Sequence, residues 1–325
     1  MKQAISIVIP ALAADESLEQ ALGSLAPELQ RRAAGDQVLL VDDSGTGAVA
    51  RALGPWGPAV ELLEMPRNSG FGRALGAGIA AARHGLVFAM NSDVRVRPGF
   101  AEPLLSALDG APGERVFAAV PRILLRGEEG RVESLVSLRL EGGIARAAQP
   151  LLEEAHFRRA DEAWLAQNRN VPFPIGGACL LRRELFLDLG GFDPAFEPFY
   201  LEDLDLGWRA WRAGWCTRYV GAAVVEHRHR ATIGARVPEQ VVLQAIERNR
   251  LLFTWKHLDD PVLLEEHLRQ LARRTAEARA AGDRVFLAAL CLALEDRGKG
   301  IAARRAESAP GRSGFARQCR DTDPF

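Results

Sequence analysis

The sequence has no long hydrophobic run, and this absence limits what the chain can be. The longest apolar run, Val285 to Leu294, is about half of the roughly 20 residues that a membrane-spanning helix needs. Met1 to Ala4 lead directly into a strand-like run, without the apolar region and cleavage site of a signal peptide. We therefore expect neither a membrane span nor a leader.

Net charge and cysteine are also scarce. The formal net charge is −1, so the chain as a whole has no electrostatic attraction for nucleic acid. The 4 cysteines lie far apart, with neither the CxxC spacing of a zinc site nor the density of a secreted disulfide scaffold. These features indicate a protein of the reducing cytoplasm that has no nucleic-acid partner.

Strand-like and helix-like segments alternate in the N-terminal part of the chain. Ile5 to Ile9 is a β-branched run, and Ser17 to Leu29 then places leucines at helical spacing. Further apolar strands are predicted at Gln37 to Val41, Val60 to Glu64 and Leu86 to Met90. This alternation predicts an α/β fold with a mostly parallel, Rossmann-like central sheet, flanked by helices and binding ligands at the carboxyl ends of its strands.

Acidic turns follow two of these apolar strands, at Asp42 to Gly45 and at Asn91 to Asp93. Carboxylates at this edge of a sheet can accept hydrogen bonds from ribose hydroxyls or from a base. A carboxylate beside a nucleotide diphosphate can also bind a hard divalent cation, which makes Asp93 the candidate metal ligand. Each turn taken alone is equally compatible with an ordinary polar loop after a buried strand.

The order of several motifs resembles a known family. The motifs of the first half are Val8-Ile9-Pro10, Val41-Asp42-Asp43-Ser44-Gly45, Asn68-Ser69-Gly70-Phe71-Gly72 and Asn91-Ser92-Asp93. Those of the second half are Gly176-Gly177-Ala178, Gly190-Gly191-Phe192-Asp193 and Glu202-Asp203-Leu204-Asp205. In this order they resemble the inverting family 2 glycosyltransferases of the GT-A fold, and in particular its rhamnosyltransferase-type members.

The resemblance implies a displacement in which a carboxylate deprotonates the acceptor hydroxyl. It assigns this general base to Asp203, and it assigns Glu202 and Asp205 to orienting Arg209, Trp208 or the acceptor. Taken alone, these acids are equally compatible with a solvated first helical turn. The implied donor-binding residues are Pro10, Asp42, Asp43, Asn68, Gly70, Arg73, Asn91 and Ser92. We expect Asp43, Asp93 and Asp203 to converge on one cleft.

The resemblance also implies a divalent metal, Mg²⁺ or Mn²⁺, held by Asp93 and His227, with His229 as the alternative ring. Arg228 and Arg230 would then lie in a loop that closes over the donor. The sequence departs from the family pattern at Gly76, where many members carry Asn, and at Ala11 to Ala14, where Asn or Tyr is common.

The implied substrates are a dTDP- or UDP-sugar donor and a hydroxyl of a glycan or lipid-linked acceptor in polysaccharide biosynthesis. Such an enzyme would be cytoplasmic, and a lipid-linked acceptor would place it at the inner face of the membrane. Peripheral membrane contact and a homodimer both remain open. The expected organisation is a GT-A domain at 1–235, with a nucleotide-sugar-binding half at 1–100 and an acceptor-binding half at 101–235, then a helical extension at 236–303 and a flexible tail at 304–325.

Two other functions compete with this one. A non-catalytic nucleotide-sugar-binding protein would have the same fold, and it would bind the donor without turnover. A nucleotidyltransferase would also combine an α/β sheet with acidic metal sites, but it should carry a Gly-rich basic loop after its first strand. Ala11 to Glu16 contains no such loop.

Overall fold

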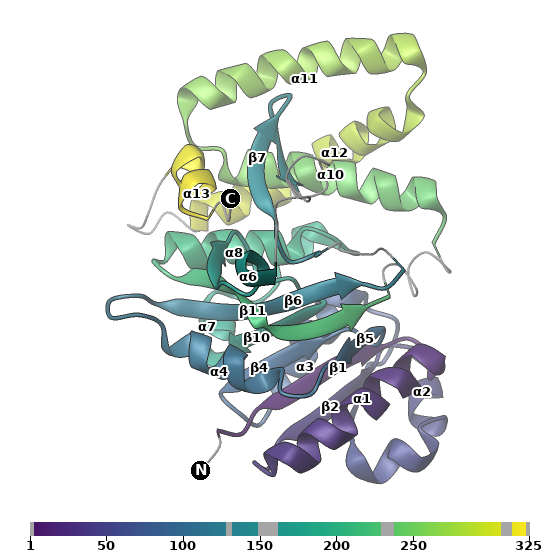
Figure 1. The fold of residues 1–325 in the computed structure, drawn as a ribbon. Coiled ribbons are helices and arrows are strands. Elements are labelled where there is room, and N and C mark those ends of the chain that lie inside the picture. Colours follow the sequence, from purple (N-terminus) through teal and green to yellow (C-terminus); the bar gives the residue numbers. More distant parts are fainter. Residues whose placement is uncertain (1–2, 128–131, 149–161, 229–236, 307–313, 323–325) are drawn as a thin grey trace.

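The computed structural model describes residues 3–127, 132–148, 162–228, 237–306 and 314–322 (Figure 1). The strands are β1 (Ser6–Ala11), β2 (Gln37–Asp42), β3 (Glu61–Glu64), β4 (Leu86–Met90), β5 (Val94–Val96), β6 (Val116–Leu125), β7 (Ser137–Glu141), β8 (Ile144–Ala148), β9 (Arg169–Val171), β10 (Ala178–Arg182) and β11 (Cys216–His227). The helices are α1 (Glu16–Arg32), α2 (Ala48–Arg51), α3 (Phe71–Ala81), α4 (Ala101–Asp109), α6 (Glu162–Leu165), α7 (Arg183–Asp188), α8 (Glu202–Arg212), α10 (Glu239–His257), α11 (Pro261–Ala281), α12 (Arg284–Ala306) and α13 (Phe315–Asp321). Short 3-10 turns, η1 (Gly54–Ala59) and η3 (Pro194–Phe196), complete the described elements.

The central sheet has the strand order β3-β2-β1-β4-β10-β6-β11-β5, and β9 pairs with β11. The first four strands of this order are parallel, and β6 is parallel to β11. Strand β10 runs antiparallel between β4 and β6, and β5 and β9 run antiparallel to β11. The α/β fold predicted from the alternation is confirmed.

The N-terminal strands are apolar because helices cover them. Every residue of β2 and β4 is buried, as expected for strands inside a sheet that is covered on both faces. Helix α3 packs closely on β1 and β2 because Gly78 has no side chain. A Cβ there would lie 2.4 Å from Val8 Cγ1 and 2.7 Å from Val41 Cγ2. This close packing fixes where α3 begins, beside the carboxyl edge of the sheet.

A second hydrophobic core joins α8 to the C-terminal helices. It contains residues of the β7–β8 hairpin, α8, α10, α12 and α13, and Trp208 of α8 lies at its centre. The Trp208 ring packs edge-on against Phe253 of α10, with ring centroids 5.8 Å apart. In Figure 1, helices α10, α11 and α12 lie on the side of the molecule away from β1 and β2. The helical extension and α8 therefore share one core.

Part of the tail predicted at 304–325 forms a helix, α13, which packs on the second core. Phe315 of α13 is only 2% exposed and stacks on Trp208, with ring centroids 5.4 Å apart. The polar composition of this segment gave no indication that one aromatic side chain, Phe315, packs into the second core. Residues 307–313 and 323–325 lie outside the described structure. None of the helices in the described ranges is both long enough and apolar enough to cross a bilayer.

Candidate active site

Asp42 and Asp43 end β2 at the carboxyl edge of the sheet, and they have different partners. Asp42 Oδ1 accepts a hydrogen bond from Ser44 N at 2.9 Å, and Oδ2 accepts from Val49 N and Ala50 N at 3.0 and 3.1 Å. Burial alone would raise the pKa of Asp42, but these hydrogen bonds hold it below its usual value. Asp42 is 1% exposed and organises the start of α2.

Asp43 instead holds the turn that precedes α3. Its Oδ1 accepts hydrogen bonds from Ser69 N at 2.8 Å and Ser69 Oγ at 2.6 Å, and its Oδ2 accepts from Gly70 N at 3.1 Å. The two turns touch directly, because a Cβ on Gly45 would lie 2.6 Å from Arg67 Cα. The predicted donor residues Asn68 and Gly70 are thereby fixed next to the end of β2. Pro10 pairs with Val41 at the end of the neighbouring β1.

Asn91, Ser92 and Asp93 connect β4 to β5 at the same edge. Asn91 N donates to Gly177 O at 2.8 Å, so the turn before β10 lies directly on this segment. Within the described part of the chain, Asn91 Oδ1 and Asp93 Oδ1 are buried without a hydrogen-bond partner. Buried polar oxygens are normally hydrogen-bonded, so these two oxygens are candidates for contact with a ligand.

His227 lies at the end of β11, paired with Val94, and faces Asp93. Its Nε2 is 3.2 Å from Asp93 Oδ1, an ion-pair distance without the alignment of a hydrogen bond. Its Nδ1 is 2.7 Å from Glu133 Oε2. Burial alone would lower the pKa of His227, but the two carboxylates outweigh it and raise the pKa to about 10. His229 and Arg230 lie outside the described residues, whereas Arg228 N donates to Asp93 O at 3.1 Å.

A divalent cation fits these residues. Among the described residues there is no cluster of three or more acidic, His or Cys side chains that could hold a metal without other ligands. Asp93 and His227 offer one carboxylate and one imidazole, and a diphosphate and water can supply the remaining ligands. Glu133 occupies the place of the carboxylate that commonly orients a metal-binding imidazole through its second nitrogen. The sequence held no signal for Glu133, an isolated acid in an irregular segment.

Glu202 and Asp203 begin α8. Asp203 Oδ2 accepts from Gly176 N at 3.1 Å and Oδ1 from Leu204 N at 2.8 Å, which fixes the plane of the carboxylate. Glu202 is 7% exposed, and its Oε2 has no hydrogen-bond partner among the described residues. Burial raises the pKa of Asp203 to about 6. Burial, and then the charge of Asp203, raise the pKa of Glu202 to about 8. Because both pKa values are raised, the pair tends to hold one proton near neutral pH, and the larger shift is that of Glu202.

The donor-side turns and the Asp203 carboxylate meet at one glycine turn. Gly176 donates to Asp203, whereas the next residue, Gly177, accepts from Asn91. A Cβ on Gly176 would lie 3.1 Å from the ring of Phe71, the first residue of α3. A Cβ on Gly177 would lie 3.1 Å from the Asn91 amide. Only a chain without side chains here lets α3, the end of β4 and the start of α8 approach one another.

Asp205 lies apart from this edge, in the second core. It is fully buried: Oδ2 accepts from Arg209 Nε at 2.8 Å, Oδ1 from Lys256 Nζ at 2.7 Å, and His257 Nε2 lies 2.6 Å from Oδ1. Burial alone would raise the pKa of Asp205, but the charges of Arg209 and Lys256 and the hydrogen bond with His257 hold it well below its usual range. Arg209 in turn donates to Gly191 O at 2.7 Å. The predicted contact between Asp205 and Arg209 is present, and it supports the Gly190-Gly191 turn.

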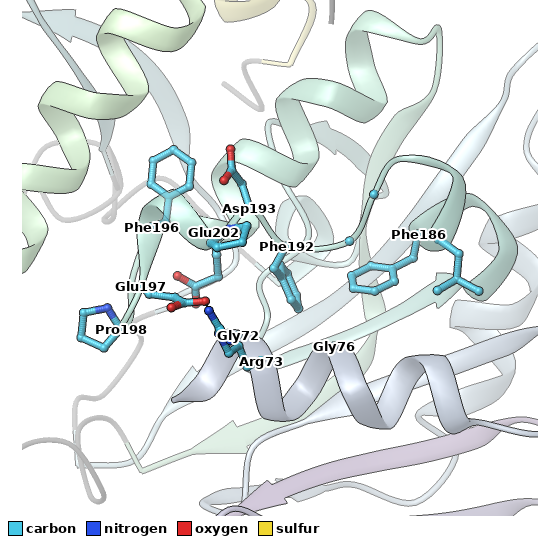
Figure 2. Close-up of a pocket in the computed structure, with 14 residues that line it drawn as sticks. Gly72, Arg73, Gly76, Phe186, Phe192, Asp193, Phe196, Glu197, Pro198 and Glu202 are labelled. Carbon is cyan, nitrogen blue, oxygen red and sulfur yellow. The ribbon is translucent and has the colours of Figure 1, made fainter. Parts of the chain in front are cut away.

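A pocket of about 520 Å³ opens beside the acidic pair, between α3 and the segment from α7 to η3 (Figure 2). Gly72, Arg73 and Gly76 line it from α3, and Glu202 reaches it from α8. Arg73 pairs with Glu197 across its rim. Gly76, where the family pattern has Asn, faces the Phe192 ring, whose Cδ2 would be 3.8 Å from an added Cβ. Of the acidic pair only Glu202 lines this pocket, and Asp203, Asp43, Asp93 and His227 do not.

Comparisons with known sequences agree with this arrangement. The model of "Glycosyl transferase family 2" matches residues 6–190, and that of "Glycosyl transferase family group 2" matches residues 145–240. N-acetylglucosaminyl-diphospho-decaprenol L-rhamnosyltransferase of Mycobacterium tuberculosis is 32% identical over 252 residues, or 71% of this chain and 79% of that protein. Pre-mycofactocin glycosyltransferase of the same organism is 30% identical over 174 residues, or 54% of this chain and 33% of that protein.

Solved structures show the same fold. The structure of GalNAc-T7 with UDP, GalNAc and Mn²⁺ superposes with a TM-score of 0.59 at 17% identity, covering 79% of this chain and 48% of that one. S. aureus TarS 1-349 in complex with UDP-GlcNAc superposes with a TM-score of 0.57 at 12% identity, covering 99% of this chain and 88% of that one. The fold and the site thus define a nucleotide-sugar-dependent glycosyltransferase of the GT-A class. The chain belongs to glycosyl transferase family 2 and resembles its rhamnosyltransferases.

Proposed function

We propose that this enzyme transfers a sugar, with inversion, from a dTDP- or UDP-sugar to a hydroxyl of a lipid-linked glycan in polysaccharide biosynthesis. The observation that carries the proposal is the acidic pair beside the glycine turn that also holds Asn91, with Glu202 buried and Asp203 half-buried. The two carboxyl groups have different pKa values, so Asp203 can act as a base while Glu202 donates a hydrogen bond. The name of the rhamnosyltransferase relative, which acts on a diphospho-decaprenol substrate, supports the lipid-linked acceptor.

Asp203 acts as the general base. Its carboxylate is held by two backbone N–H groups, and its pKa of about 6 leaves it ionised near neutral pH. It takes the proton of the acceptor hydroxyl as the oxygen attacks the anomeric carbon from the face opposite the leaving diphosphate. Glu202, neutral at this pH, can donate a hydrogen bond to a sugar hydroxyl, which its oxygen without a partner is free to do.

On the donor side, the Asp43-held turn and the Asn91–Asp93 segment bind the nucleotide diphosphate. Asp93 and His227 would hold Mg²⁺ or Mn²⁺, which supplies positive charge to the diphosphate as it leaves. The Mn²⁺ in the solved GalNAc-T7 structure supports this part of the proposal. The division into a donor half at 1–100, an acceptor half at 101–235 and an extension at 236–303 belongs to the same proposal.

A lipid-linked acceptor requires the enzyme to work at a membrane surface, and we propose the cytoplasmic face. Leu292 and Leu294 of α12 are 41% and 42% exposed, although both lie in the apolar run singled out from the sequence. These two exposed leucines are the apolar surface that a membrane or a second copy of the chain would cover. Co-sedimentation with vesicles that carry a polyprenyl-diphosphate glycan, and sedimentation velocity without them, separate the two.

The test of the proposed reaction begins with a panel of nucleotide sugars. Thermal shift with Mn²⁺ or Mg²⁺ finds the donor, because a ligand that binds the native state raises its Tm. NMR of the product formed on a diphospholipid-linked acceptor then gives the anomeric configuration. An inverted anomer is expected, and a retained one contradicts the role of Asp203. Donor binding without transfer or hydrolysis in any combination would favour the non-catalytic alternative.

A further inference from the structure

The segment that leads into α8 has an unusual backbone. Tyr200 and Leu201, the two residues before the acidic pair, have φ values of 73° and 71°. Residues other than glycine rarely occupy this left-handed region, and two in succession persist only where the surroundings hold them. The direction in which Asp203 leaves the backbone depends on this segment, because Leu201 is the N-cap of α8.

One side chain of the helical extension holds this segment. Asn249 of α10 is completely buried, and its Nδ2 donates to Phe196 O at 2.8 Å, Phe199 O at 3.1 Å and Tyr200 O at 2.8 Å. A primary amide has two N–H groups, so one of them is shared between two carbonyls. All three carbonyls belong to the segment between η3 and α8.

The neighbouring arginine orients that amide. Arg248 donates from NH1 to Asn249 Oδ1 at 2.6 Å, which leaves the nitrogen of the amide facing the three carbonyls. Arg248 also donates from NH1 to Glu197 O at 3.2 Å and pairs with Asp296 of α12. The amide is thus anchored by two helices of the extension.

We propose that Asn249 is a positioning residue: it holds the left-handed Tyr200–Leu201 backbone and thereby sets the orientation of the Asp203 carboxylate. This inference rests on the proposed function, since it assigns the helical extension a part in the transfer step. It predicts that loss of Asn249 lowers the rate of transfer more than it weakens donor binding, because Asp43 and the end of β4 hold the donor-side turns, although Gly70 and Arg73 also touch this segment.

The test compares Asn249→Ala with Thr254→Ala. Thr254 lies on the same helix and is 1% exposed, but its hydroxyl accepts from Ala145 N at 3.0 Å, away from the segment before α8. Both substitutions remove hydrogen bonds from backbone groups, three carbonyls in Asn249→Ala and one N–H in Thr254→Ala, so Tm should fall in both and further in Asn249→Ala. Only Asn249→Ala should lower kcat at least tenfold, with a donor KM within threefold of the unmutated enzyme and a displaced acidic limb of the pH profile.

Hydrogen exchange gives a readout that does not require activity. Amides of residues 200–204 should exchange faster in Asn249→Ala than in Thr254→Ala. Unchanged exchange, or an equal loss of kcat in both variants, overturns the proposal. If Asn249→Ala does not fold, Arg248→Met removes the group that orients the amide and is expected to act in the same direction. Absence of transfer by the unmutated protein would instead overturn the proposed function, and the exchange comparison would still decide what Asn249 holds.

Discussion

Replacing Asp203 by Asn is the sharpest test of the reaction that we propose. Asn keeps the size of the side chain and one oxygen that can accept from Gly176 N, although its amide nitrogen cannot accept from Leu204 N. The change removes the base, and a positioned general base contributes roughly 10²- to 10⁴-fold in rate. This loss corresponds to about 3–5 kcal/mol of transition-state stabilisation. Glu202→Gln, next to it, is the matched control, because that acid is already neutral near pH 7.

The pH dependence of kcat gives a second, independent test of Asp203 as the base. With a pKa of about 6 for Asp203, the ionised fraction of the base falls about tenfold for each pH unit below that value. At saturating donor, kcat of the unmutated enzyme should therefore rise between pH 5 and 7 and then level off. The residual rate of Asp203→Asn should lack this rise. A flat profile for the unmutated enzyme, with Tm unchanged over the range, or Asp203→Asn with more than about a tenth of the normal kcat, refutes the assignment.

Three further predictions test stability and the metal. Glu202 has a higher pKa in the folded than in the unfolded protein, so the folded state loses stability as pH rises from the unfolded towards the folded pKa. Glu202→Gln should therefore raise Tm at pH 8 and not at pH 4. Each unit of pKa difference is worth about 1.4 kcal/mol of stability. Asp93→Asn should abolish the rise in Tm that Mn²⁺ adds to donor binding, and an undiminished rise would exclude Asp93 as a ligand. Phe315→Ala should cost about 3–5 kcal/mol in denaturant unfolding, and a loss below about 1 kcal/mol would mean that α13 contributes little to the core.

Sequence patterns within short segments were enough to predict the N-terminal strands and helices. The β-branched runs of β1 and β2 and the leucine spacing of α1 are properties of short segments, and the structure has these elements close to the predicted limits. The boundaries moved by a few residues because capping decides them: Asp15, not predicted as a cap, accepts from Leu18 N at 3.1 Å and starts α1 at Glu16. The aromatic anchor of α13 could not be foreseen, because a single Phe in a polar segment has no periodicity.

The sequence by itself determined the order of the motifs, and with it the family, the sheet and the acids at its edge. It could not distinguish among those acids, since a carboxylate is identical in a helix cap, a buried ion pair and a reaction centre. The tertiary structure separated Asp42 and Asp205, whose oxygens are occupied by backbone amides and cations, from Asp93 and Glu202. Within the described ranges, each of these two keeps an oxygen without a hydrogen-bond partner. Only folding brings such partners together, because Asp205 meets Lys256 across about 50 residues of chain, a distance over which no local pattern extends.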